Sequence, residues 1–183
     1  FCKPWHAGVD LATWPGFRAA PKDIDVLVFV KFLWDRPGGA RRVLEPLLAA
    51  LARRGKRVHV LRYGAYEPGE YRTLLRRSRA MAYLCEHETQ GIATAEAMAC
   101  DVPILAWDQG EWKDPIRLVY SQDRVPASSV PYFDATCGDR FRGPEDMDLA
   151  LDRFFEALPR YRPRDFARRR LSFESSAALY EEA

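Results

Sequence analysis

Four strand-like runs rich in apolar residues alternate along this chain with stretches whose apolar residues recur at helical spacing. The runs cover residues 25–30, 57–63, 80–85 and 102–107. The stretches between them cover residues 40–54, 69–79 and 91–100. Short continuous apolar runs are typical of parallel strands buried on both faces. The alternation predicts right-handed βαβ units, and therefore an α/β fold with a Rossmann-like parallel sheet and helices on both faces.

The chain divides into three expected parts. Residues 1–21 are rich in Pro, Gly and Trp without periodicity, which indicates a linker or extended arm. Residues 22–158 hold the α/β lobe, with a turn over 32–39 and a helix over 144–158. Residues 159–183 form a helical tail of one or two helices. The stretch from 108 to 143 reads as irregular, apart from a short strand expected near 129–132.

Composition excludes few functions and bounds the cellular setting. The chain has 183 residues and a formal net charge of +2, which gives no argument for a nucleic-acid partner. No apolar run approaches the about 18 residues that a membrane span needs. Four scattered cysteines without a C-x-x-C pair predict reduced, mostly buried thiols and a cytoplasmic protein. We expect no signal peptide. Because the first residue is Phe1 and not Met, we also expect a piece of a longer protein.

Two glutamates flank a small-residue turn between two expected strands. Glu88 follows the end of the strand 80–85, Gly91 opens the next helix, and Glu96 falls in its second turn. Ligands of open α/β sheets bind beyond the carboxyl ends of the strands. A helix N-terminus there offers free N–H groups to a phosphate, and Gly91 would let it approach the backbone closely. The two carboxylates would then accept hydroxyl groups of a sugar and of a ribose.

The same stretch resembles the retaining glycosyltransferases of the glycogen-synthase-like superfamily, also called glycosyl transferases group 1. Glu88-Thr89-Gln90-Gly91 stands where these enzymes have E-G-F-G, and Glu96-Ala97-Met98-Ala99-Cys100-Asp101-Val102-Pro103 where they have E-A-M-A-x-G-x-P. The resemblance implies the C-terminal, nucleotide-sugar-binding lobe of a GT-B fold. It also implies that Glu88 contacts the donor sugar and Glu96 the ribose. Thr89-Gln90 and Asp101 depart from the family pattern.

The resemblance extends over nearly the whole chain. The family's basic pair after the first strand corresponds to Lys31 and Arg36, with the residue types exchanged. Fixed cations there would stabilise the leaving diphosphate without a metal. Residues 8–15 resemble the interlobe segment, residues 106–110 replace a glycine loop, and Pro131-Tyr132 with the final helix resembles the tail. Compared with the family pattern, this chain lacks one βα unit between the first strand and Tyr66.

Several residues admit more than one interpretation. His87, between two acids, is placed badly for a metal cage because neighbours on an extended segment point opposite ways. It either lines the donor site or is structural. Tyr63-Gly64 ends a strand at the ligand edge and could pack under the nucleotide base. The arginine-rich residues 160–170 form either a solvated helix or a contact with anionic lipid or a lipid-linked acceptor.

The sequence therefore predicts the donor lobe of a metal-independent hexosyltransferase. Its substrate would be a UDP-, GDP- or ADP-sugar, without a further cofactor, and its acceptor a glycan, a lipid-linked molecule or a small molecule. Catalysis would rest on Lys31, Arg36 and Glu88. Donor contacts would come from His87, Glu88, Thr89, Gln90, Gly91, Ile92, Glu96, Tyr63 and Gly64. The alternatives are another GT-B enzyme, either a nucleotide-sugar epimerase or a phosphorylase, and a non-catalytic α/β interaction domain.

Overall fold

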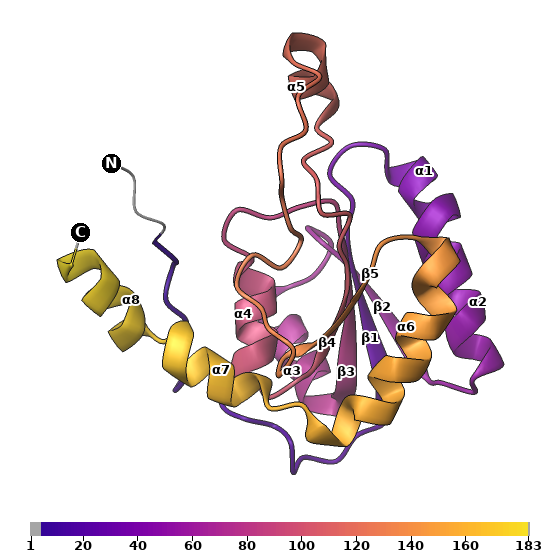
Figure 1. Ribbon diagram of the computed structural model, residues 1–183. Coiled ribbons are helices and arrows are strands. Elements are labelled where there is room, and N and C mark those ends of the chain that lie inside the picture. Colours follow the sequence, from indigo (N-terminus) through magenta and orange to yellow (C-terminus); the bar gives the residue numbers. More distant parts are fainter. Residues whose placement is uncertain (1–4, 183) are drawn as a thin grey trace.

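The computed structural model describes residues 5–182 and has three layers, with a parallel sheet between two layers of helices (Figure 1). The strands are β1 (Ile24–Lys31), β2 (Val58–Arg62), β3 (Ser78–Cys85), β4 (Ile104–Trp107) and β5 (Gly138–Phe141). The helices are α1 (Arg36–Gly39), α2 (Glu45–Arg53), α3 (Pro68–Arg77), α4 (Ile92–Ala99), α5 (Pro115–Tyr120), α6 (Pro144–Ala157), α7 (Pro163–Arg170) and α8 (Phe173–Glu181). The predicted α/β class and parallel sheet are confirmed.

The five strands lie in the order β2-β1-β3-β4-β5, and every neighbouring pair is parallel. The register sets Lys31 beside Cys85, so the last residues of β1 and β3 are neighbours. The chain reverses direction of travel across the sheet between β2 and β3. Ligands of open α/β sheets bind outside the carboxyl ends of the strands at such a switch point.

Each face of the sheet is covered by its own hydrophobic cluster. Alternate strand residues point to opposite faces, so Leu27 and Phe29 join one cluster and Val28 and Val30 the other. Helices α3, α4 and α7 cover the first face, and α2 and α6 cover the second (Figure 1). Because both faces are covered, the inner residues of the central strands, 26–30 and 80–84, are hydrophobic rather than alternating. At about 25 cal/mol per Å² of apolar area buried, these two clusters dominate the stabilisation of the fold.

Three local predictions were wrong. Residues 36–39, expected in a turn, form α1, because Asp35 accepts a hydrogen bond from the backbone N–H of Gly38 and caps the helix. A π-helical turn, Ala40–Leu44, then joins α1 to α2. The strand expected near 129–132 is absent, and those residues form bends. The fifth strand is instead β5, whose polar sequence GDRF carries no apolar run.

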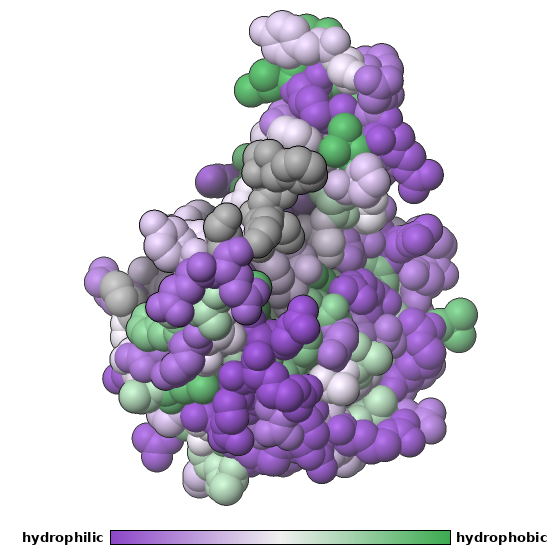
Figure 2. All heavy atoms as spheres, turned by 60° about the vertical axis from the view of Figure 1, so that its left-hand side comes forward, coloured by the Kyte–Doolittle hydropathy of each residue, from purple (hydrophilic) through white to green (hydrophobic). Residues whose placement is uncertain are grey.

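A projecting arm made of residues 108–128 rises from the carboxyl end of β4 and carries α5 at its tip (Figure 1). Within the arm, the backbone N–H of Trp112 donates a hydrogen bond to the carbonyl oxygen of Val125 at 2.9 Å, which joins the two sides of the arm. Ile116, Val119 and Tyr120 are exposed at the tip. Irregularity was the only sign of this arm in the sequence. Figure 2 shows the projection standing clear of a largely hydrophilic body.

The N-terminal residues pack along α4 and the last two helices. Val9 forms a parallel bridge with Ser172, and the Arg164 guanidinium donates hydrogen bonds to the carbonyl oxygens of Leu11, Trp14 and Ala99. One member of the arginine-rich run is therefore a structural residue. The division into arm, lobe and tail stays a prediction.

Asp101, which replaces the glycine of the family pattern, has a φ of 61° in the turn before β4. This left-handed conformation is the one in which glycine is favoured, so the residue lies where the resemblance predicts a turn. Its carboxylate accepts a hydrogen bond from Arg18 at 2.5 Å. The substitution thereby ties the N-terminal segment to the sheet.

Cys85, Cys100 and Cys137 are free and buried, as predicted, while Cys2 lies outside the described residues. Burial raises the pKa of each of these three thiols to about 12. Between residues 5 and 182, none of the helices has the length and apolar character needed to cross a membrane.

Candidate functional site

The carboxyl ends of β1 and β3 bring Lys31 and Glu88 together. The Nζ of Lys31, the last residue of β1, lies 2.5 Å from Oε1 of Glu88, in the loop after β3. The two side chains retain only 19% and 11% of their exposure. The ion pair is therefore partly buried at this edge. Separating the two side chains would leave each charge unpaired in a low dielectric, and this cost favours the paired arrangement. Two residues predicted separately as a cation and a sugar ligand are thus direct partners.

Tyr83 completes this pair and was not predicted. Its hydroxyl donates a hydrogen bond to the same Oε1 of Glu88. The ring is fully buried in β3, and burial, followed by the nearby Cys85 and Glu88, raises the pKa of Tyr83 well above its ordinary value. The phenol therefore stays a neutral donor. A tyrosine inside an apolar strand needs a partner for its hydroxyl, and that need was the available signal.

Tyr63 lies next to the pair at the end of β2. The Nζ of Lys31 lies 4.8 Å from the centroid of the Tyr63 ring, within the range of a cation–π contact. Tyr63 is 56% exposed, and Gly64 follows it with a φ of 77°. The structure thus brings the predicted Tyr63-Gly64 turn to the same edge of the sheet as Lys31 and Glu88.

The N-terminus of α4 opens next to Glu88. Gly91 is the N-cap residue with φ 66° and ψ 45°, and no side chain caps the first turn. The N–H groups of that turn are consequently available to an anion. A Cβ on Gly91 would lie 2.8 Å from Thr94 Oγ1 and 3.5 Å from Pro131 Cδ. The left-handed backbone favours glycine here, and Pro131 lies on the side toward which a Cβ would point. The close approach of a ligand to Gly91 stays a prediction.

Glu96 borders a second hollow along α4. The cavity, of about 360 Å³, is lined by Glu96 and Ile92 from α4, by Phe173, and by residues of the N-terminal segment such as Asp10 and Trp14. Burial raises the pKa of Glu96 to about 7. Within residues 5–182 its carboxyl makes no hydrogen bond or ion pair. A half-buried carboxyl without a partner is suited to accept hydroxyl groups.

An aromatic cluster connects the surroundings of the two glutamates. Phe29 packs against Tyr66, Tyr71 and Tyr83 with ring centroids 5.2–5.9 Å apart. Tyr83 bonds to Glu88, whereas burial and then the charge of Glu96 raise the pKa of Tyr66. Both carboxylates therefore border one aromatic cluster.

His87 is held between two tryptophans. Its ring stacks on Trp34 with centroids 5.2 Å apart and meets Trp112 at 5.6 Å. Trp34 follows β1 and Trp112 belongs to the projecting arm, so the stack joins two loops at the ligand edge. Burial lowers the pKa of His87 despite the opposing charge of Glu88. The aromatic residues that follow β1 and β4 were the overlooked signal for this cluster.

The remaining predicted site residues take different positions. Arg36 is exposed at the start of α1 and makes no ion pair in the part of the chain that the structure describes. Thr89 is exposed, and Ile92 is 57% exposed on the first turn of α4. The Gln90 amide is used elsewhere: Oε1 accepts from Ala7 N–H at 2.7 Å and Nε2 donates to the Trp5 carbonyl at 3.2 Å. Gln90 therefore holds the N-terminal segment in this structure.

Across residues 5–182, no three His, Cys, Asp or Glu side chains are grouped as a metal ion would require. Asp108 illustrates how acids at this edge are used. It is buried, pairs with Arg140 at 3.1 Å and accepts a hydrogen bond from Ser128 at 2.7 Å. Asp25, the second residue of β1, pairs with Arg57 at 3.0 Å.

Comparisons with known proteins define the class of fold. No protein-family model matches the chain, and no curated protein sequence matches it either. Among solved structures, the chain is similar to the apo form of the lipopolysaccharide outer core galactosyltransferase WaaB, with a TM-score of 0.58 and 12% identity over 97% of this chain and 55% of that one.

It is also similar to sucrose-phosphate synthase from Thermosynechococcus elongatus, with a TM-score of 0.53 and 17% identity over 96% of this chain and 50% of that one. The chain thus spans about half the length of these proteins. Its fold is the Rossmann-like lobe of GT-B glycosyltransferases, as the sequence predicted.

Proposed function

We propose that this chain is the donor-binding, C-terminal lobe of a retaining glycosyltransferase that transfers a hexose from a nucleoside-diphosphate sugar without a metal. The observation that carries the proposal is the Lys31–Glu88 pair beside the uncapped N-terminus of α4. A cation, a hydroxyl acceptor and free N–H groups meet at one edge of the sheet. These are the groups that a sugar diphosphate needs.

The pair suggests how binding would proceed. In the absence of a donor, Lys31 and Tyr83 both bond to Oε1 of Glu88. An arriving diphosphate carries more negative charge than one carboxylate, so Lys31 would turn to it and neutralise the charge that grows on the leaving group. Glu88 would stay oriented by Tyr83 and would present its oxygens to the sugar hydroxyls. Arg36 would add a second cation once the loop before α1 adjusts.

Glu96 and Tyr63 would serve the nucleoside. The carboxyl of Glu96 has no partner in the described part of the chain and accepts hydroxyl hydrogens in either protonation state. It would hold the ribose diol, while Tyr63-Gly64 would lie under the base. Thr89, Ile92 and His87 would bound the donor, and Gln90 would do so only after releasing the N-terminal segment. The acceptor and part of the chemistry would belong to an N-terminal lobe outside this chain.

Calorimetric titration tests this proposal. We expect UDP, GDP or ADP to bind to this chain, and we expect this chain alone to transfer little sugar. Glu88→Gln should weaken binding of the matching nucleotide sugar relative to binding of the nucleotide, because it alters the sugar contact and at the same time releases Lys31 from its ion pair. Glu45→Gln, on α2, is the matched control. Absence of heat with all three nucleotides would contradict the proposal.

A further inference from the structure

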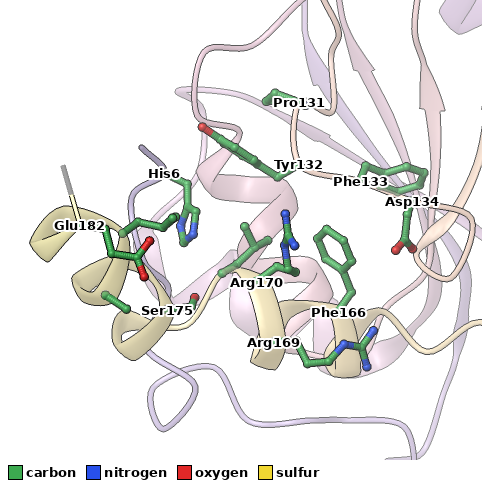
Figure 3. Close-up of a pocket in the computed structure, with 13 residues that line it drawn as sticks. His6, Pro131, Tyr132, Phe133, Asp134, Phe166, Arg169, Arg170, Ser175 and Glu182 are labelled. Carbon is green, nitrogen blue, oxygen red and sulfur yellow. The ribbon is translucent and has the colours of Figure 1, made fainter. Parts of the chain in front are cut away.

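A large cavity lies away from the donor site, between the loop 131–134 and the last two helices. Its volume is about 870 Å³. Figure 3 shows that side chains reach it from four parts of the chain: the N-terminal segment, the loop, α7 and α8. Pro131, which covers Gly91, borders this cavity, and neither Glu88 nor Glu96 lines it. The cavity is therefore a separate feature of the molecule.

His6 is a polar side chain left without a partner in the wall of this cavity. Only 5% of its surface is exposed, and neither Nδ1 nor Nε2 makes a hydrogen bond within the described residues. The ring is held in place, since it meets the Tyr132 ring edge-on at 5.5 Å and the His6 carbonyl accepts a hydrogen bond from Ser176 at 2.7 Å. Buried polar groups are normally satisfied, so this imidazole points to a missing ligand.

Two arginines supply positive charge to the same cavity. Arg170 extends from the end of α7 toward Tyr132, and Arg169 lies on the side of Asp134 (Figure 3). Neither guanidinium makes an ion pair among residues 5–182. A free guanidinium is a planar donor that matches a phosphate group through two parallel hydrogen bonds.

The rest of the wall is suited to a ring that carries hydroxyl groups. Tyr132, Phe133 and Phe166 give aromatic and apolar surface. Asp134 uses Oδ1 to accept hydrogen bonds from Thr136 and leaves Oδ2 without a partner in the described part of the chain. Small-ligand sites commonly combine such apolar walls with a few fixed polar groups. A bare anion would use the arginines and His6 but not this surface.

We propose that this cavity binds a phosphorylated sugar. Its phosphate lies between Arg170 and His6, and its ring rests against the aromatic wall with hydroxyl groups directed to Asp134. The site is distinct from the donor site and does not depend on the donor proposal. It gives the chain a second small-molecule ligand, bound where the N-terminal segment meets the C-terminal helices.

Titration with glucose 6-phosphate tests the site in the unmodified chain. Calorimetry should show saturable binding, and the His6 side-chain nitrogen signals should shift in NMR spectra of the same sample. Inorganic phosphate and glucose alone should each bind at least ten-fold more weakly. Saturating UDP should leave the affinity for glucose 6-phosphate unchanged, whether or not UDP itself binds.

Arg170→Ala should reduce the affinity for glucose 6-phosphate at least ten-fold. The matched control is Arg168→Ala, which removes an exposed arginine of the same helix that does not line the cavity. His6→Gln tests the imidazole, and because Arg170 is exposed its variant is expected to fold even if the His6 variant does not. Equal affinities for the Arg170 and Arg168 variants would overturn the proposal. So would an unmoved His6 signal, equal binding of inorganic phosphate, or binding to phosphatidic acid vesicles alone.

Discussion

The amino group of Lys31 and the carboxylate of Glu88 form an ion pair 2.5 Å long between residues 57 positions apart. The parallel register of β1 and β3 creates this contact, because it sets the ends of the two strands side by side. Tyr83, two residues before the end of β3, gives the carboxylate its second donor. A donor diphosphate would compete with Glu88 for one lysine, so the pair links the fold to the proposed binding.

Lys31→Met should weaken nucleotide diphosphate binding about 10- to 100-fold, since a hydrogen bond from a charged group contributes about 1.5–3 kcal/mol. Calorimetry at fixed ionic strength measures the change. Lys56→Met removes a lysine that lies over Phe155 on another part of the molecule, and it should leave binding unaltered. Equal losses in the two variants would show that Lys31 acts only through net charge.

Tyr83→Phe should lower the free energy of unfolding by about 1–3 kcal/mol, because Glu88 loses a donor in a half-buried position. Urea denaturation followed by circular dichroism gives this value. Tyr180→Phe removes the hydroxyl of an exposed tyrosine on α8 and should change stability by less than about 0.5 kcal/mol. A neutral Tyr83→Phe would mean that the hydroxyl is not part of the site.

The stability of the protein should fall between pH 5 and pH 7 relative to a Glu96→Gln variant. The pKa of Glu96 is raised to about 7 by burial, so the folded chain holds a proton there that the unfolded chain releases near its ordinary pKa of 4.5. Unfolding therefore becomes easier as the pH rises to about 7, and the effect levels off above it. Because the carboxyl is partly exposed, we expect the free energy of unfolding to fall by about 1–2 kcal/mol over this range.

The measurement is the difference in unfolding free energy between wild type and Glu96→Gln at pH 5 and at pH 8. Taking the difference removes the contribution of other titrating groups. The free energy of unfolding of the variant, relative to that of the wild type, should increase as the pH rises. A difference that is the same at both pH values would place the pKa of Glu96 near its ordinary value.

Gly91→Ala should lower the free energy of unfolding by about 1–2 kcal/mol, because a side chain in the left-handed region is strained and the new Cβ would press on Thr94. It should also weaken nucleotide binding by moving the first N–H groups of α4. Gly69→Ala is the control, since no atom lies within 4 Å of its added Cβ and it sits in the first turn of α3. That change should be neutral or stabilising by up to about 1 kcal/mol. Thermal unfolding of both variants measures these two changes in stability.

Trp112→Ala should raise the pKa of His87 toward its ordinary value of 6.5, because the tryptophan contributes to the burial that lowers it. NMR titration of the imidazole follows the change. Tyr120→Ala, at the exposed tip of the same projecting arm, should leave the His87 titration where it is. Identical titration curves in all three proteins would show that the arm does not shield His87.

The sequence by itself determined the layered α/β architecture. Residues 26–30 of β1 are apolar at every position, and this pattern is stable only between two covered faces. It also determined which edge carries the candidate site, because Glu88 and Gly91 follow a strand and open a helix. These properties depend on neighbours in the chain, where periodicity and turn chemistry act directly.

Tertiary structure decided the rest. The pairing of Lys31 with Glu88, the donor role of Tyr83 and the stacking of His87 between two tryptophans all join residues from different loops or strands. Strand β5 forms from the polar residues GDRF because β4 offers a free edge for main-chain hydrogen bonds. The segments that meet at an edge depend on sheet order and register, which are fixed only when the whole chain packs.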